Sequence, residues 1–284
     1  MRHLIIGASG QVGGYLWRAL QNDPSQESIG TYFSNPVTGQ LHLDFTDGSS
    51  VNRVLQEEKP DVVWLPAALP DVDRCEKDPD LSYRLNVKAP CQVGDACRDA
   101  GVKVVFFSTD YVFDGTKGPY RETDATHPLQ VYGRHKVQTE EYLLQKIPHA
   151  LIIRPAWIYS DDPNPRNFVF RILQQLESGK PVRAATDQVN TPTNSQDLVT
   201  RSLDAVLQHR EGILHIVGPD RLSRYDLTLK IAEEHGYSKS LIEPITTESL
   251  HLPARRPLNG GLISVRDNTR FYGFYDSRGL AVEE

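Results

Sequence analysis

Short apolar runs alternate with amphipathic stretches along the first half of the chain. Continuous apolar runs such as 61–65 and 102–107 are typical of strands that a parallel sheet buries on both faces. Apolar residues about four positions apart, as at Val12, Leu16 and Leu20, predict helices. The predicted strands are 3–6, 29–33, 41–43, 61–65, 102–107 and 150–153, and the predicted helices are 11–21, 51–58, 81–100 and 131–146. Strands separated by helices predict a parallel sheet with right-handed crossovers.

This rhythm changes after Pro155, where prolines and loops become more frequent. Further helices are predicted over 167–178, 195–209 and 223–235. The sequence therefore predicts an α/β fold. Residues 1–157 would form a Rossmann-like doubly wound parallel sheet, and residues 158–284 mainly a smaller C-terminal substrate-binding lobe, with the chain free to cross between them. The lobe is expected to pack against the carboxyl ends of the strands, where open parallel sheets bind ligands.

Composition narrows the class of protein further. The 284 residues carry 31 basic and 37 acidic side chains, a net charge of −6 that disfavours a nucleic-acid partner. No apolar run approaches the roughly 20 residues of a membrane span, and the N-terminus lacks the features of a secretory signal. Cys75, Cys91 and Cys97 form no CxxC pair, which is typical of reduced thiols. We therefore expect a cytoplasmic protein with neither a nucleic-acid nor a membrane partner, and no metal site.

A glycine-rich segment follows the first predicted strand and opens the first predicted helix. Its spacing, GxxGxxG, places Gly7 at a tight turn, Gly10 where the backbone can approach a pyrophosphate, and Gly13 where the helix packs against the strand. The free N–H groups of the helix N-terminus would bind phosphate. A plain glycine turn is the alternative, but the strand–turn–helix context favours a dinucleotide site in this first unit.

The end of the second predicted strand bears on the choice of cofactor. Residues 31–35 contain no Asp or Glu to bind both ribose hydroxyls of NAD(H), and no Arg to bind a 2′-phosphate. The missing acid favours NADP(H) and leaves NAD(H) open. Asp44 and Phe45, after the third strand, are candidates for contact with the adenosine end, with turn capping as the alternative for Asp44.

Three polar residues at separate places form the candidate catalytic set. Tyr132 and Lys136 lie four positions apart on a predicted helix, so both side chains share one face. The ammonium is expected to lower the pKa of the phenol, which would make Tyr132 a usable general acid. Thr109 begins a polar segment where the strand 102–107 ends. Each feature alone has a simpler explanation, as a surface pair or an ordinary turn, but together they fall at the required places of one βαβ series.

Specific segments then carry a resemblance to a known family. They are GASGQVG (7–13), VDRCEKDP (72–79), STDYVFDGTKGPYRETD (108–124), YGRHK (132–136), RPAWIY (154–159) and PARRP (253–257). On these motifs the chain resembles the extended short-chain dehydrogenases/reductases, and within them the dTDP-4-dehydrorhamnose reductases. The likeness covers nearly the whole chain.

The resemblance implies roles for individual residues. Tyr132 would protonate the sugar oxygen as hydride reaches C4, Lys136 would bind the nicotinamide ribose, and Thr109 would hydrogen-bond the reacting oxygen. The cofactor would also be contacted by Gly7, Gly10, Gln11, Val12, Gly13, Asp44, Phe45, Pro66, Ala67, Ala68 and Phe107. The substrate would be contacted by Thr109, Asp110, Trp157, Arg255 and Arg256, the two arginines being candidates for its diphosphate.

Two segments depart from the family pattern. Pro70 follows the fourth strand where the family usually has a threonine, which removes a hydroxyl and a backbone donor. Residues 269–276 replace the amphipathic helix that normally closes the family's chain. Both departures bear on the identity of the substrate more than on the chemistry.

Three functions compete at this point. The first is an NADPH-dependent reductase of a nucleotide-linked 4-keto-6-deoxy sugar, with a homodimer left open. The second is a non-catalytic NADP-binding regulator, because the resemblance extends to the regulatory subunit of methionine adenosyltransferase. The third, a nucleotide-sugar epimerase or dehydratase, is disfavoured, because dehydratases of this group usually carry an acidic pair after the catalytic threonine, whereas here Asp110 is followed by Tyr111.

Overall fold

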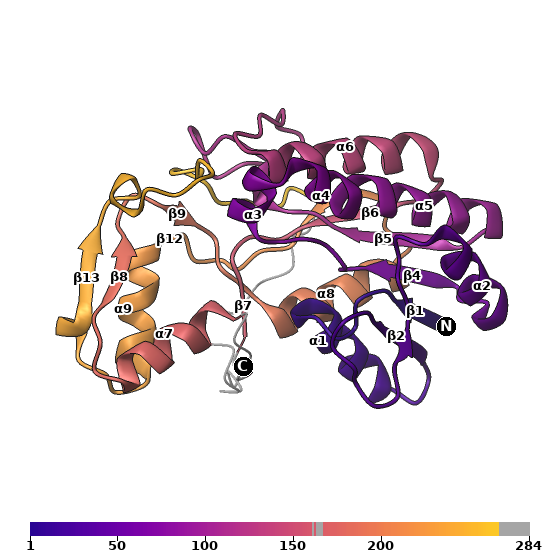
Figure 1. Cartoon of the computed structure of the whole chain (residues 1–284), viewed down its shortest axis with the longest axis horizontal. Helices are drawn as coiled ribbons and strands as arrows, with labels where there is room; N and C mark the ends of the chain where they lie inside the picture. Colours follow the sequence, from indigo (N-terminus) through magenta and orange to yellow (C-terminus); the bar gives the residue numbers. More distant parts are fainter. Residues whose placement is uncertain (161, 163–166, 267–284) are drawn as a thin grey trace.

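A parallel sheet forms the centre of the molecule (Figure 1). The computed structural model describes residues 1–160, 162 and 167–266. In this part of the chain the sheet has seven strands in the order β11-β6-β5-β4-β1-β2-β3, all pairs parallel. The strands are β1 (Arg2–Ile5), β2 (Glu27–Tyr32), β3 (Leu41–His42), β4 (Val62–Leu65), β5 (Lys103–Phe107), β6 (Leu151–Arg154) and β11 (Gly212–His215). This order confirms the predicted Rossmann-like sheet, whose strand order reverses between β1 and β4.

Helices cover both faces of the sheet, as Figure 1 shows. One face carries α1 (Gln11–Gln21) and α8 (Ser195–Leu207), and the other carries α2 (Gly48–Glu58), α5 (Ala89–Ala100) and α6 (Val131–Lys146). Successive residues of β4 point to opposite faces: Val63 and Leu65 pack in one apolar cluster, and Val62 and Trp64 in the other. This double burial explains why β4 is a continuous apolar run in the sequence.

The prediction of one continuous helix over 81–100 is wrong, because this range is divided into shorter helical elements. The structure has α3 (Val72–Lys77), α4 (Pro79–Tyr83), one π-helical turn at Arg84–Lys88, and then α5. Pro90 has no N–H group to donate to the carbonyl of Asn86 one turn earlier. The hydroxyl of Thr139 on α6 donates to that carbonyl at 2.5 Å instead. The irregular turn is therefore stabilised by a contact from a distant part of the chain.

The bounds of all six predicted strands also differ from the prediction by one or two residues. The strand predicted over 29–33 is β2, which ends at Tyr32 and leaves the Phe33 side chain 58% exposed. The strand predicted over 150–153 is β6, which extends to Arg154 because the backbone of that residue still pairs with His215 of β11.

The second half of the chain builds a lobe beside the sheet and then returns to the sheet. The lobe contains α7 (Phe168–Glu177), α9 (Arg224–Glu234), and the strand pairs β7 (Ile158–Tyr159) with β10 (Thr193–Asn194), β8 (Val182–Ala185) with β13 (Ile242–Ile245), and β9 (Val189–Asn190) with β12 (Leu222–Ser223). Short 3₁₀ turns lie at Asp110–Val112, Lys239–Leu241 and Glu248–Leu250. Because α8 packs on α1 and β11 pairs with β6, the chain crosses between lobe and sheet. The substrate-binding role of the lobe stays a prediction.

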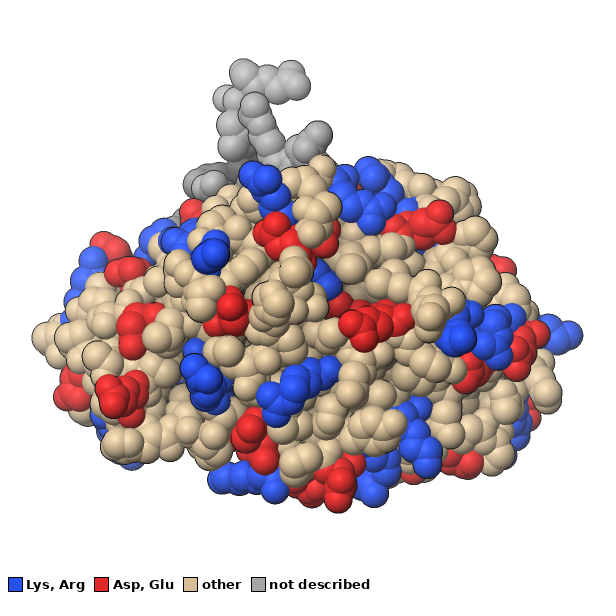
Figure 2. All heavy atoms as spheres, turned by 90° about the horizontal axis from the view of Figure 1, so that it is seen from above, with Lys and Arg blue, Asp and Glu red and all other residues tan. Residues whose placement is uncertain are grey.

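Charged side chains of both signs are interspersed on the face shown in Figure 2. Among the described residues, no helix combines the length and apolar character needed to span a membrane.

Truncation of a central strand residue tests this core. Ile152 on β6 is fully buried in the cluster under α2, α5 and α6. We expect Ile152→Ala to lower the free energy of unfolding by about 2–5 kcal/mol, because the substitution removes buried methyl groups and leaves a cavity. Urea unfolding would measure the loss. Leu207→Ala, at a side chain 54% exposed, is the control and is expected to change stability little. Equal losses in both variants would contradict the assigned core.

Candidate active site

The loop between β1 and α1 has the geometry of a phosphate cradle. Gly7 has φ of +100°, a conformation that side-chain-bearing residues rarely adopt. A Cβ on Gly13 would overlap the carbonyl oxygen of Gly7, so only glycine allows α1 to begin so close to the turn. The N-cap Gly10 offers no side chain to the first N–H groups of α1. These groups are thus available to an anion, and the loop fits the pyrophosphate of a dinucleotide.

The two further segments predicted to contact the cofactor follow β4 and β3. Ala67 donates its N–H to the carbonyl of Ile6 at 3.1 Å, and its Cβ lies 3.0 Å from where a Cβ on Gly7 would be. The segment 66–68 therefore borders the cradle. Asp44 accepts hydrogen bonds from the N–H and hydroxyl of Thr46 at 2.9 and 2.7 Å, so its carboxylate caps a turn.

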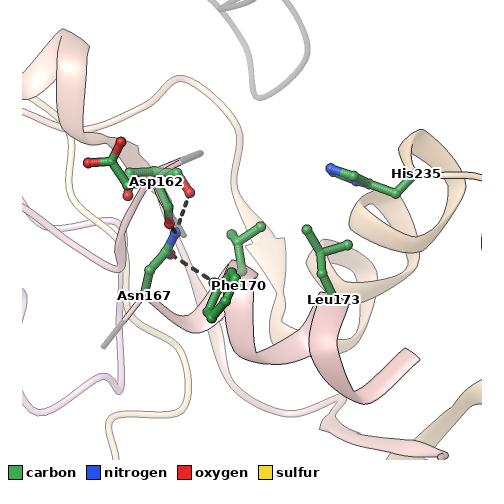
Figure 3. Close-up of a pocket in the computed structure, with 7 residues that line it drawn as sticks. Asp162, Asn167, Phe170, Leu173 and His235 are labelled. Carbon is green, nitrogen blue, oxygen red and sulfur yellow. Dashed lines mark hydrogen bonds between the residues drawn. The ribbon is translucent and has the colours of Figure 1, made fainter. Parts of the chain in front are cut away.

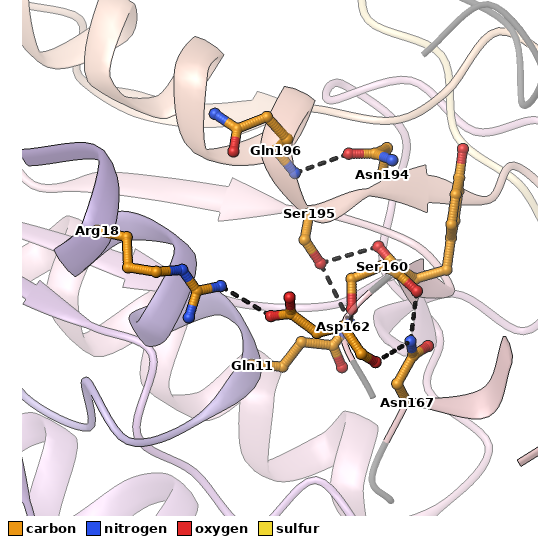
Figure 4. Close-up of polar contacts among 9 residues, drawn as sticks. Gln11, Arg18, Ser160, Asp162, Asn167, Asn194, Ser195 and Gln196 are labelled. Carbon is orange, nitrogen blue, oxygen red and sulfur yellow. Dashed lines mark hydrogen bonds and ion pairs between the residues drawn. The ribbon is translucent and has the colours of Figure 1, made fainter. Parts of the chain in front are cut away.

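Polar contacts connect α1 to the second half of the chain (Figure 4). The amide of Gln11 donates to the hydroxyls of Ser195 at 3.1 Å and Ser160 at 3.4 Å. Arg18, two turns along α1, forms an ion pair with Asp162 at 2.7 Å. The side chain of Gln11 thus joins α1 to α8 and to the segment after β7, while its backbone N–H remains at the cradle.

The three predicted catalytic residues lie together at the carboxyl end of β5. Lys136 on α6 donates from Nζ to the carbonyl of Phe107 at 2.8 Å. Its Nζ also lies 4.3 Å from the centre of the Phe106 ring and 5.8 Å from that of Tyr132. The hydroxyl of Thr109, two residues after Phe107, accepts from the N–H of Tyr111 at 3.2 Å.

Burial sets the ionisation of this set. Burial raises the pKa of Tyr132 well above its ordinary value, against an opposing hydrogen bond with Thr109. The sequence-based expectation of a lowered phenol pKa is therefore wrong, because desolvation of the phenolate dominates. Burial also lowers the pKa of Lys136 to about 7, although the nearby charge of Glu140 opposes this. Tyr132 thus stays protonated at neutral pH and is suited to donate a proton.

A buried charge network, which was not predicted from the sequence, lies next to Lys136 on α6. Arg154 at the end of β6 donates to both carboxylate oxygens of Glu140, at 2.9 and 2.5 Å. Its third contact is His215 on β11 at 3.4 Å, and burial lowers the pKa of that imidazole to about 4. The only signal in the sequence is that Glu140 follows Lys136 by one helical turn.

Asp110 is held inside the site by a residue from the lobe. Asn190 on β9 donates to one carboxylate oxygen at 2.6 Å, and Thr109 donates to the other at 3.2 Å. Burial raises the pKa of Asp110 to about 6, against the opposing effect of these hydrogen bonds. Asn190 was not predicted, because nothing local marks a residue 80 positions away as its partner.

The remaining predicted substrate residues differ in their surroundings. Trp157 follows β6 and has φ of +36°, a strained conformation that often occurs at functional sites. Arg256 forms an ion pair with Asp73 at 2.6 Å, whereas Arg255 is exposed. The unusual segment 269–276 lies outside the described residues.

A cavity of about 320 Å³ lies between α7, α9 and the segment after β7 (Figure 3). Its lining residues are Ser160, Asp162, Asn167, Val169, Phe170, Leu173 and His235. It therefore borders the Gln11 contacts rather than the catalytic set. Within the described ranges, no group of acidic, histidine or cysteine side chains has the arrangement of a metal site.

Comparison with known proteins identifies the family. A family model described as "RmlD substrate binding domain" matches residues 1–273. The chain belongs to this family. It is 32% identical over 274 residues to the dTDP-4-dehydrorhamnose reductase of Salmonella typhimurium, covering 92% of this chain and 89% of that protein. It is 33% identical over 264 residues to a probable low-salt glycan biosynthesis reductase of Haloferax volcanii, covering 90% and 88%.

Solved structures agree with this membership of the RmlD family. A dTDP-4-dehydrorhamnose reductase of Clostridium acetobutylicum is 33% identical with a TM-score of 0.83, over 93% of this chain and 90% of that one. The enzyme of Bacillus anthracis, crystallised in complex with NADP, is 28% identical with a TM-score of 0.84, over 92% and 89%. The resemblance drawn from the sequence motifs is confirmed.

The buried carboxyl of Asp110 makes the stability of the fold depend on pH. Its pKa is about 6 in the folded chain against an ordinary 3.8, so the folded state binds the proton more tightly than the unfolded state. Stability is consequently lost as pH rises through this interval. We expect Asp110→Asn to raise the free energy of unfolding by about 1–3 kcal/mol near pH 8 and to change it little near pH 4.

Urea unfolding at the two pH values would test this expectation. Asp204→Asn, at an exposed position of α8, is the matched control and is expected to show no such difference. A gain of equal size at both pH values would show that charge burial is not its cause.

Proposed function

We propose that this chain reduces the 4-keto group of a dTDP-linked 4-keto-6-deoxy sugar with NADPH. The observation that carries the proposal is the convergence of Thr109, Tyr132 and Lys136 at the end of β5 in a chain about one-third identical to named reductases. As a member of the RmlD family, the chain is an NAD(P)H-dependent oxidoreductase. The 4-position and the dTDP carrier follow the names of its relatives, the dTDP-4-dehydrorhamnose reductases.

The proposed reaction uses each catalytic side chain once. NADPH supplies the hydride that reduces the carbonyl carbon. Tyr132 donates its phenolic proton to the carbonyl oxygen, and the hydroxyl of Thr109 hydrogen-bonds the same oxygen. Lys136, cationic in part near neutral pH, stabilises the phenolate that remains and holds the nicotinamide ribose. A proton from water then restores Tyr132.

The cofactor would be held by the cradle already described. The first turn of α1 would bind the pyrophosphate, and Ala67 and Phe107 would border the remainder. Thr31 on β2 accepts the N–H of Gly7 at 3.2 Å, so the strand end without an acidic residue lies directly beside the loop. This arrangement supports NADP(H) and leaves NAD(H) usable.

The other candidate functions receive less support. A purely regulatory subunit is not favoured, since the relatives are named as reductases. The UDP-glucose 4-epimerase of Thermus thermophilus, 22% identical with a TM-score of 0.80, shares the fold alone. A homodimer stays a prediction.

Removal of the phenolic proton tests the mechanism. Tyr132→Phe is expected to lower kcat by about 10²–10⁴-fold, the usual contribution of a positioned general acid, and to retain NADPH binding. Loss of NADPH absorbance with dTDP-4-dehydrorhamnose would measure turnover, and quenching or transfer of NADPH fluorescence would measure binding. Tyr142→Phe, on the same helix but hydrogen-bonded to Asp95, is the matched control. Near-normal turnover in Tyr132→Phe would refute the assigned role.

A further inference from the structure

Arg224 occupies an unusual position beside the candidate substrate site. It is the first residue of α9, and its guanidinium carbon lies 3.6 Å from the centre of a Trp157 ring and 4.8 Å from that of Phe168. Stacking of this kind holds the guanidinium plane and leaves its N–H edge available for hydrogen bonds. No local motif in the sequence marks Arg224 as a functional residue.

The pairing of β9 with β12 places Arg224 beside the candidate substrate site. Asn190 on β9 lies opposite Leu222 on β12, and Arg224 continues the pairing by donating its backbone N–H to Gln188 at 2.9 Å. Asn190 hydrogen-bonds Asp110, so the same pair delivers both side chains to one place. Arg224 lies within electrostatic range of Asp110 and of Tyr111. The Tyr111 ring is in turn 6.1 Å from that of Tyr132.

Within the described part of the chain no carboxylate forms a direct ion pair with Arg224, and the charge of Asp110 acts on its guanidinium only at longer range. Burial lowers its pKa to about 10, and the guanidinium groups of Arg171 and Arg256 add repulsion. A cation in the first turn of a helix also opposes the helix dipole. The nearest acid of that turn, Asp226, is engaged in a capping box with Ser223. Together these features make the buried guanidinium of Arg224 unfavourable for the stability of the fold, and they favour the binding of an anion to it.

We propose that Arg224 binds a phosphate oxygen of the substrate's diphosphate, with Trp157 holding the guanidinium in place. This inference rests on the proposed function, which supplies a nucleoside diphosphate as the substrate class. The planar fork of arginine suits two phosphate oxygens. The diphosphate role expected for Arg255 and Arg256 stays a prediction; Arg256 is paired with Asp73, and Arg255 is exposed. The pyrophosphate of the cofactor is a separate ligand, bound at α1.

The test compares Arg224→Gln and Arg224→Lys with the wild-type chain. Isothermal titration calorimetry would measure binding of dTDP and of thymidine, and steady-state kinetics would measure KM for dTDP-4-dehydrorhamnose and for NADPH. Arg183→Gln, at an exposed position of β8 in the same lobe, is the control for loss of one positive charge. Thymidine separates phosphate recognition from a merely structural support of Trp157.

We expect Arg224→Gln to weaken dTDP binding and to raise the KM of the keto sugar by about 10–100-fold, the range for a lost hydrogen bond to a charged group. Thymidine binding and the KM for NADPH would change little, and Arg224→Lys would recover part of the loss. The proposal is overturned if dTDP binds Arg224→Gln as it binds wild type, if thymidine is lost equally, or if Arg183→Gln has the same effect. If the wild-type chain binds dTDP but oxidises no NADPH with the keto sugar, the proposed reduction is refuted. The difference in dTDP affinity between the wild-type chain and Arg224→Gln still decides the role of Arg224 in that case.

Discussion

The arrangement of the catalytic set depends on one buried ammonium group. Lys136 donates to the carbonyl at the end of β5, and Glu140, one turn later, is bonded at both oxygens by Arg154 at the end of β6. These two attachments fix α6 across the carboxyl ends of neighbouring strands. Gly133 completes the fit, since a Cβ there would overlap the carbonyl oxygen of Tyr111. The packing of the whole helix therefore places Tyr132 beside Thr109, and its own contacts with Thr109 and Tyr111 add to this placement.

Most of the sheet could be predicted from the sequence because its signals are local. The apolar run of β4 and the glycine spacing of the phosphate loop each follow from chemistry within a few residues. The break at Arg84–Lys88 could not, because the carbonyl left free by Pro90 is satisfied by Thr139, which no local pattern reveals. The raised pKa of Tyr132 could not be predicted for a similar reason. The spacing of residues shows which side chains share a helix face, but not whether the fold excludes water from that face.

The site residues that escaped prediction have a common origin. Asn190 reaches Asp110 from a strand of two residues, β9, and such a strand has no periodicity to detect. In the sequence, Glu140 is an ordinary helix residue and Arg154 an ordinary residue at a strand end. Only the structure shows that both are buried. Active sites often hold charges in environments that disfavour them, and the stability of the surrounding fold offsets the penalty. Asp110, Lys136 and His215 are all shifted towards their neutral forms, with burial the largest cause in each case.

The return of the chain to the sheet explains how the lobe can take part in this chemistry. α8 packs on α1, the helix that follows the proposed cofactor loop, and β11 extends the sheet beside β6. Gln11, at the phosphate loop, is hydrogen-bonded to Ser195 at the start of α8. The residues that enter and leave the lobe are therefore anchored to α1 and to β6, whose Arg154 binds Glu140 on α6. Asn190, presented by β9 of the lobe, thus reaches Asp110 at the end of the sheet, although 80 positions separate the two residues in the sequence.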